Sequence, residues 1–271
     1  GREIYDPDSD AWYWLDAKQG GAKAVNKDVY QESNGGKWVR YDANGHMIKG
    51  WDTNDDGTYY FDLITGAMAK GDIVVDNLPC SFDTNTGIGC NLMWHSMDGK
   101  DYWYEAGKRQ GYDPNNAAYR GKEIYDASSD AWYWLDAVDG GAKAVNKDVY
   151  QESDGGKWVR YDENGHMIKG ENCQNGNWYC FEPVTGAMIH GPWTLPDGRK
   201  VYYDLTTGIM QYGNVSINGS LYYFDPVYGT MKSGALTNFW VTDGNGKSFW
   251  YESWVRQGWQ PGSRNYRGKE I

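Results

Sequence analysis

The chain has 271 residues and a formal charge of −11, from 26 Lys and Arg against 37 Asp and Glu. This charge, without a basic stripe, argues against binding nucleic acid, and no apolar run approaches the roughly 20 residues that membrane insertion by a helix needs. Aromatic residues make up 16%, with 15 Trp and 23 Tyr, and 36 Gly punctuate the chain. This composition favours thin, strand-built units that bury their faces against neighbours over one large core.

A long internal duplication organises the chain. Residues 1–50 recur at 121–170 with seven differences, and the segment from Asp101 to Arg120 recurs from Ser248 to Arg267. We therefore expect a first large unit at 1–120 and a second at 121–267 with about one extra hairpin. Residues 268–271 restart the unit, so we expect the natural protein to continue into a third copy.

The first strong strand signal is Trp12-Tyr13-Trp14-Leu15, which recurs from Trp132 to Leu135. Strand alternation would put Trp12 and Trp14 on one face and Tyr13 and Leu15 on the other. One face can pack while the other stacks on sugar rings or contacts a protein partner. The alternative is that both faces are buried between neighbouring hairpins.

A shorter period of about twenty residues follows inside each large unit. Its core is an aromatic strand, a turn and a Gly-x-Met-x-x-Gly ending, as in Lys37–Asp42 followed by Gly45–Gly50. Short aromatic runs bounded by Asp, Asn, Thr and Gly predict β-hairpins, and one hairpin is marginal alone. The sequence therefore predicts an all-β fold, an elongated solenoid of stacked β-hairpin repeats.

A weak calcium pattern follows the first of these hairpins. Asp52, Asn54 and Asp56 alternate before Gly57, as at the start of an EF-type loop, but position twelve is Leu63 instead of Glu. Turn chemistry is the favoured explanation, so we expect no metal site. We also expect no cofactor.

Four cysteines form two local pairs, Cys80 with Cys90 and Cys173 with Cys180. The second pair brackets Asn175-Gly176, a strong hairpin-turn signal that could bring the two sulfurs face to face. Neither spacing fits a CxxC zinc or redox motif. We therefore expect two disulfides rather than free thiols, and with them an extracellular location.

The segment Ile217–Asp225 followed by Gly229–Gly234 resembles the cell-wall-binding or choline-binding repeat superfamily, which includes streptococcal glucan-binding repeats and clostridial-toxin repeats. Residues 1–33 look like a longer variant found in surface proteins of gut Firmicutes. In the family, Trp and Tyr of adjacent hairpins form cages or platforms for choline or sugars. The choline-binding version usually has an aromatic residue directly after the closing glycine of the repeat, and here only Gly50 among the closing glycines has one. This allows one cage of Trp38, Trp51 and Tyr60 and argues against choline as the general ligand.

The sequence shows no catalytic constellation, because its Asp residues sit at turns and its four His are isolated. We expect a non-catalytic adhesive module, secreted or on a bacterial cell surface, that binds a glycan. A host extracellular protein such as an immunoglobulin or mucin is the alternative partner, and a structural spacer is the third possibility. The resemblance implies aromatic platforms drawn from Trp12, Trp14, Trp38, Trp51, Tyr60, Trp132, Trp134, Trp158, Trp178 and Trp193.

Overall fold

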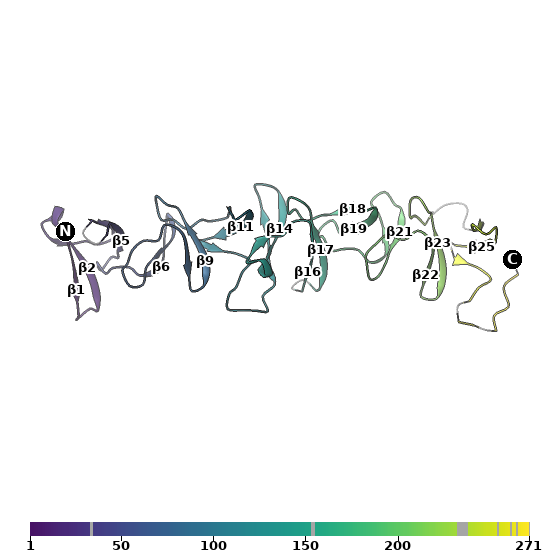
Figure 1. The fold of residues 1–271 in the computed structure, drawn as a ribbon, viewed down its shortest axis with the longest axis horizontal. Helices are drawn as coiled ribbons and strands as arrows, with labels where there is room; N and C mark the ends of the chain where they lie inside the picture. The colour runs from purple at the N-terminus through teal and green to yellow at the C-terminus, as the bar shows by residue number, and fades with distance from the viewer. Residues whose placement is uncertain are drawn as a thin grey trace. The chain divides into compact units, whose positions relative to one another are not determined.

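A computed structural model describes residues 1–32, 35–152, 155–231, 238–253, 255–260, 262–263 and 265–270. Strands and tight turns make up nearly all of this part of the chain (Figure 1). Two three-residue 3-10 helices, η1 (Ala17–Gln19) and η3 (Ala137–Asp139), each begin at an Asp cap. Gly234, the predicted closing glycine of the last hairpin, and Ile271, at the predicted third unit, lie outside the described residues.

The chain forms two compact units, Gly1–Val145 and Asn146–Ile271. The division falls after residue 145, although the sequence repeat restarts at residue 121. In the first unit, Ala142 pairs with Tyr102, which joins the first strands of the second sequence repeat to the sheet that ends the first repeat.

The first unit contains three separate small sheets and one larger one. Strands β1, β2 and β3 form one sheet, β4 pairs with β5, and β6 pairs with β7. The larger sheet has the order β13-β14-β15-β11-β12-β9-β8, with β10 on β11. The strands are β1 (Arg2–Asp6), β2 (Ala11–Asp16), β3 (Ala22–Lys23), β4 (Lys27–Gln31), β5 (Lys37–Tyr41), β6 (Gly50–Asn54), β7 (Gly57–Phe61), β8 (Gly71–Val75), β9 (Leu78–Phe82), β10 (Met93–Met97), β11 (Lys100–Glu105), β12 (Lys108–Arg109), β13 (Gly121–Asp126), β14 (Ala131–Asp136) and β15 (Ala142–Lys143).

The second unit repeats the pattern with three hairpins and a final sheet of order β22-β23-β26-β25-β24. Its strands are β16 (Lys147–Gln151), β17 (Lys157–Tyr161), β18 (Gly170–Gln174), β19 (Asn177–Phe181), β20 (Gly191–Thr194), β21 (Lys200–Tyr203), β22 (Gly213–Ile217), β23 (Ser220–Phe224), β24 (Asn238–Thr242), β25 (Ser248–Glu252) and β26 (Val255–Arg256). The strand pairings are antiparallel throughout the described residues. The prediction of an all-β fold of hairpin repeats is confirmed.

A backbone hydrogen bond joins each hairpin to the next inside a unit. The amide of Met68, which follows β7, donates to the carbonyl oxygen of Trp38 in β5 at 2.8 Å. Met188 donates to Trp158 at 2.7 Å and Met210 to Trp178 at 2.8 Å in the same way. These bonds satisfy strand edges that a lone hairpin would leave open to other chains.

In successive short repeats, the glycine of the Gly-x-Met motif packs on the methionine of the preceding repeat, as at Gly66, Gly186, Gly208 and Gly229. A Cβ added at Gly186 would lie 2.4 Å from Met167 Sδ, and one added at Gly66 would lie 2.3 Å from Met47 Sδ. Gly186 also has a φ of 67°, in the left-handed region. The motif therefore encodes contact between successive repeats as well as a turn.

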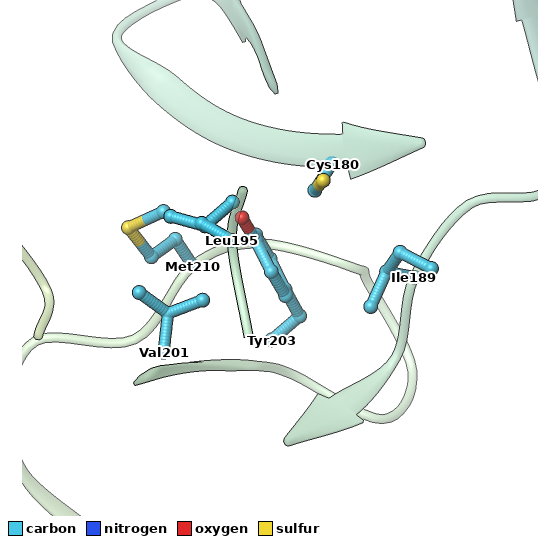
Figure 2. Packing of buried hydrophobic residues seen from close by; sticks show 6 residues of the cluster. All are labelled: Cys180, Ile189, Leu195, Val201, Tyr203 and Met210. Atoms are coloured by element: carbon cyan, nitrogen blue, oxygen red, sulfur yellow. The ribbon is translucent and has the colours of Figure 1, made fainter. Parts of the chain in front are cut away.

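The core is a row of aromatic rings at the strand ends. Tyr41, Phe61, Phe82, Phe181 and Tyr203 are completely or almost completely buried. Figure 2 shows the cluster around Tyr203, whose ring lies among aliphatic side chains with its hydroxyl directed toward the strand of Cys180. Burial raises the pKa of the Tyr203 hydroxyl. Each repeat thus contributes one large ring to a thin core shared with its neighbours.

Replacing Gly186 with Ala should destabilise the second unit by about 2–4 kcal/mol, because the methyl group meets both Met167 and an unfavourable φ. Gly176→Ala is the matched control, since Gly176 has a φ of 79° and no atom within 4 Å of an added Cβ. It should cost about 1 kcal/mol. Urea unfolding of both variants measures the difference, and equal losses would contradict the packing role of Gly186.

Candidate functional site

Four solvent-facing pairs of Tyr and Trp share one geometry. In each, the rings lie across a hairpin with centroids 5.3–5.4 Å apart and planes inclined by 46–52°. All eight rings are exposed, for example Tyr30 at 47% and Trp38 at 41%. The pairs are Tyr5–Trp12, Tyr30–Trp38, Tyr125–Trp132 and Tyr150–Trp158.

Strand register explains this geometry. Tyr30 in β4 is directly opposite Trp38 in β5, and the adjacent pair Val29 and Val39 points into the core. Alternation along a strand therefore turns the aromatic pair outward wherever the valine pair turns inward. Cross-strand aromatic contact then restrains both rings, which lowers the entropy lost when a ligand stacks on them.

A groove of about 810 Å³ in the first unit includes the Tyr30–Trp38 pair. Carboxylates of Asp16, Asp28 and Glu32 also line it, together with Lys18 and Lys27. An open groove with an aromatic wall and a few polar groups suits a ligand that has both apolar faces and hydroxyls.

The polar groups of the groove are held in place to different degrees. Asp16 accepts hydrogen bonds from Lys27 Nζ at 2.5 Å and from the Lys18 amide at 2.9 Å, and these two bonds lower the pKa of its carboxyl. Asp28 receives two bonds from Arg40 at 2.7 and 3.0 Å. Glu32 is exposed, so its carboxylate faces solvent at the groove.

The predicted platform residues fall into different environments. Trp12, Trp38, Trp132, Trp158 and Trp178 are exposed, and all but Trp178, which is opposite Cys173, belong to a Tyr–Trp pair.

Trp14 and Trp134 are core residues, with 7% and 5% of their surface exposed. Only an edge of Trp14 reaches the groove beside Tyr30 and Trp38. Strand alternation groups Trp12 with Trp14 but cannot show that Trp14 packs in a cluster with Val29, Val39 and Tyr41. Trp12 lies outside this cluster, near the turn that follows β1 and opposite Tyr5.

The predicted cage is only partly assembled. Trp51 and Tyr60 are cross-strand partners with centroids 5.2 Å apart, whereas Trp38 pairs with Tyr30 in the preceding hairpin. Lys108 Nζ lies 4.3 Å from the centroid of Trp51. Trp193 is half-buried against the cluster of Figure 2.

Sequence reasoning missed the tyrosine partners Tyr5, Tyr30, Tyr125 and Tyr150, and also the Trp240–Trp250 pair, whose centroids lie 5.2 Å apart. The signal for the tyrosines was present: Tyr30 lies in a strand-like run beside the aromatic strand at 37–41. Pairing those two runs across their Gly-rich turn would have placed Tyr30 opposite Trp38.

Side chains of the predicted calcium pattern form hydrogen bonds within the protein. Asp52 accepts a hydrogen bond from Arg40 Nη1 at 2.9 Å, and Asn54 Oδ1 accepts the amides of Asp56 and Gly57. The ion pair with Arg40 and the turn hydrogen bonds of Asn54 therefore account for the pattern. Within the described residues, no group of three or more His, Cys, Asp or Glu side chains is arranged to hold a metal ion.

Asp residues at the repeat turns take the structural role predicted from the sequence. Asp62, Asp83 and Asp204 each accept backbone amides two and three residues ahead. These bonds lower the pKa of all three carboxyls, whereas a general acid at neutral pH needs a raised pKa.

The disulfide prediction is wrong, because all four cysteines are free thiols. Cys173 is opposite Trp178 and Cys180 is opposite Glu171, so the two cysteines are diagonal neighbours. Diagonal positions lie roughly 7–8 Å apart, beyond the usual disulfide span. Cys90 Sγ contacts the hydroxyl of Ser81 in β9. Cys80 is the neighbouring residue in β9, so its side chain points to the opposite face of that strand. The inference of an extracellular location from oxidised cysteines therefore lapses.

Thiol titration should separate these residues. Cys173 is exposed and should react readily with a thiol reagent at pH 8, whereas burial raises the pKa of the Cys80 and Cys180 thiols and should make them slow. Unfolding should release all four, and a reducing agent should leave Tm unchanged. Fewer than four thiols in the unfolded, unreduced chain would restore the disulfides.

In the described part of the chain, no helix has the length and apolar character to cross a membrane. No family model matches the chain. Glucosyltransferase-S of Streptococcus mutans is 27% identical over 209 residues, which cover 72% of this chain and 14% of that protein. The chain thus corresponds to a small part of the curated relative that it matches.

Solved structures share the fold over the whole chain. CbpJ from Streptococcus pneumoniae has a TM-score of 0.61 at 20% identity and matches 100% of this chain and 99% of its own. Choline binding protein F from the same species has a TM-score of 0.58 at 21% identity, with 100% and 98% covered. The predicted resemblance to this repeat superfamily is confirmed at the level of the fold.

Proposed function

Because the chain has the hairpin-repeat fold of choline-binding proteins, we propose that it is a non-catalytic module of a secreted or cell-surface protein and binds a cell-wall or other glycan. The observation that carries the proposal is the recurrence of one exposed Tyr–Trp geometry at four hairpins. The match to part of a glucosyltransferase agrees with a carbohydrate ligand.

The chemistry of a sugar fits these pairs. The C–H face of a pyranose ring is apolar and can pack on Trp38, while its hydroxyls need acceptors and donors at the ring edge. In the groove of the first unit, Asp16, Glu32 and Lys18 supply them. A single such contact is weak, and several pairs on one chain raise the apparent affinity for a repeating polymer.

Choline is a poorer fit to the proposed sites. A quaternary ammonium needs several aromatic faces around it, whereas each Tyr–Trp pair offers two rings inclined by about 50°. A host protein is the competing partner, since exposed Trp and Tyr also act as binding hot spots. The two ligands are separated by competition with soluble sugar.

Trp38→Ala should weaken glycan binding in the first unit by about tenfold or more, equivalent to ~1.4 kcal/mol. The binding partner is first identified on a glycan array and then titrated against the whole chain. Tyr228→Ala is the matched control, because Tyr228 is an exposed ring at a turn tip outside the four pairs. It should bind like the unmodified chain.

The proposal fails if Trp38→Ala and Tyr228→Ala bind the glycan equally, with both variants folded by circular dichroism. Saturable capture of a host protein that soluble sugar does not reduce would assign the same aromatic pairs to protein binding.

A further inference from the structure

A second groove in the first unit lies beside Trp51, at residues distinct from those around Tyr30 and Trp38. Its volume is about 410 Å³. Apolar and aromatic side chains of Trp51, Val75, Leu78, Tyr112 and Tyr119 line it, together with Lys108. Neither Tyr112 nor Tyr119 was singled out by sequence analysis.

The fold fixes Lys108 above Trp51. Strand β12 pairs with β9, where Lys108 is opposite Cys80, and Trp51 packs on the cluster of Cys80 and Phe82. Lys108 Nζ therefore lies 4.3 Å from the Trp51 ring centroid. An ammonium over a Trp face is a favourable cation–π contact, so the side chain is held at the groove instead of sampling solvent freely.

The Lys108 ammonium has hydrogen-bond donors that a ligand could use. A lysine carries three N–H donors, and the contact found for Lys108 Nζ within the described chain is the one with the Trp51 ring. The groove also contains Asp76 and Asp113, and Asp113 accepts the Asn115 amide at 2.9 Å. Arg109, the neighbouring cation, is stacked on Tyr102, 3.8 Å from its centroid.

We propose that this groove is a subsite for a saccharide that carries a carboxylate. The carboxylate accepts N–H donors of Lys108, and the sugar ring packs between Tyr112 and Tyr119. The same ammonium occupies the Trp51 face that a quaternary ammonium would need, so the groove selects an anionic ligand over a cationic one.

The second sequence repeat has no counterpart of Trp51 or of Lys108. Glu171 stands at the position of Trp51, and Val255 stands at the position of Lys108 when Tyr104 is matched with Tyr251 and Arg109 with Arg256. The subsite therefore belongs to the first repeat, and the two repeats differ in what they bind. This inference deepens the proposed glycan binding, because it names a class of sugar.

The test titrates the whole chain with methyl glucuronide, methyl glucoside, acetate and choline, and follows the indole N–H signal of Trp51 by NMR. Methyl glucuronide should bind at least tenfold more tightly than methyl glucoside or acetate. Lys108→Gln should weaken the glucuronide about tenfold and allow choline to shift the Trp51 signal. Lys247→Gln removes the same charge from an exposed position outside the groove and should behave like the unmodified chain.

Equal binding of glucuronide and glucoside, or an unchanged preference in folded Lys108→Gln, would overturn the proposal. If acetate binds as tightly as the glucuronide, the groove recognises a carboxylate alone and the saccharide part of the proposal is wrong. Choline binding to the unmodified groove would refute the role of Lys108. Trp38→Ala, tested in parallel on neutral glycans, reports on the first groove alone, so failure of one site is distinguishable from failure of the other.

Discussion

The bond between one hairpin and the next is the constraint on which the rest of the structure depends. A two-stranded hairpin is marginal in water, and here the methionine amide of the Gly-x-Met turn donates to a strand of the preceding hairpin, as Met68 does to Trp38. The glycine two residues before that amide packs on the previous methionine. Backbone pairing and side-chain packing therefore fix the same repeat-to-repeat step.

This stacking decides which aromatic rings remain exposed. The carbonyl of Trp38 is used between repeats, while its side chain lies across the hairpin from Tyr30 on the outer face. A ring at the end of the same strand, Tyr41, is buried and receives a hydrogen bond from Gln31. One short strand thus supplies a stacking bond, a surface platform and a core ring.

The chain's own cations limit the aromatic surface further. Arg40 lies 4.0 Å from the centroid of Tyr59, and Arg160 lies 4.1 Å from that of Tyr179. Each guanidinium also holds the Asp opposite it in its own hairpin by two hydrogen bonds. A further bond, from Arg40 to Asp52 and from Arg160 to Asn172, reaches the next hairpin. The four Tyr–Trp pairs carry no such cation in the described chain, which leaves their faces open to a ligand.

Much of the fold could be read from the sequence, because its determinants are local. The Asn175-Gly176 turn has positive φ at both residues, as the dipeptide predicts, and the duplication at an offset of 120 residues fixed the matching strands. Alternation within a strand could also say which residues share a face.

Only the tertiary structure decided what covers each face. The sequence cannot distinguish Trp12 from Trp14, because burial of Trp14 comes from Val29, Val39 and Tyr41 of the following hairpin. It suggested a Cys173–Cys180 disulfide, whereas the strand register makes these residues diagonal neighbours. It also could not place Lys108 over a ring 57 residues earlier in the chain. Contacts within a hairpin are encoded by neighbouring residues, whereas contacts between hairpins depend on how the repeats stack.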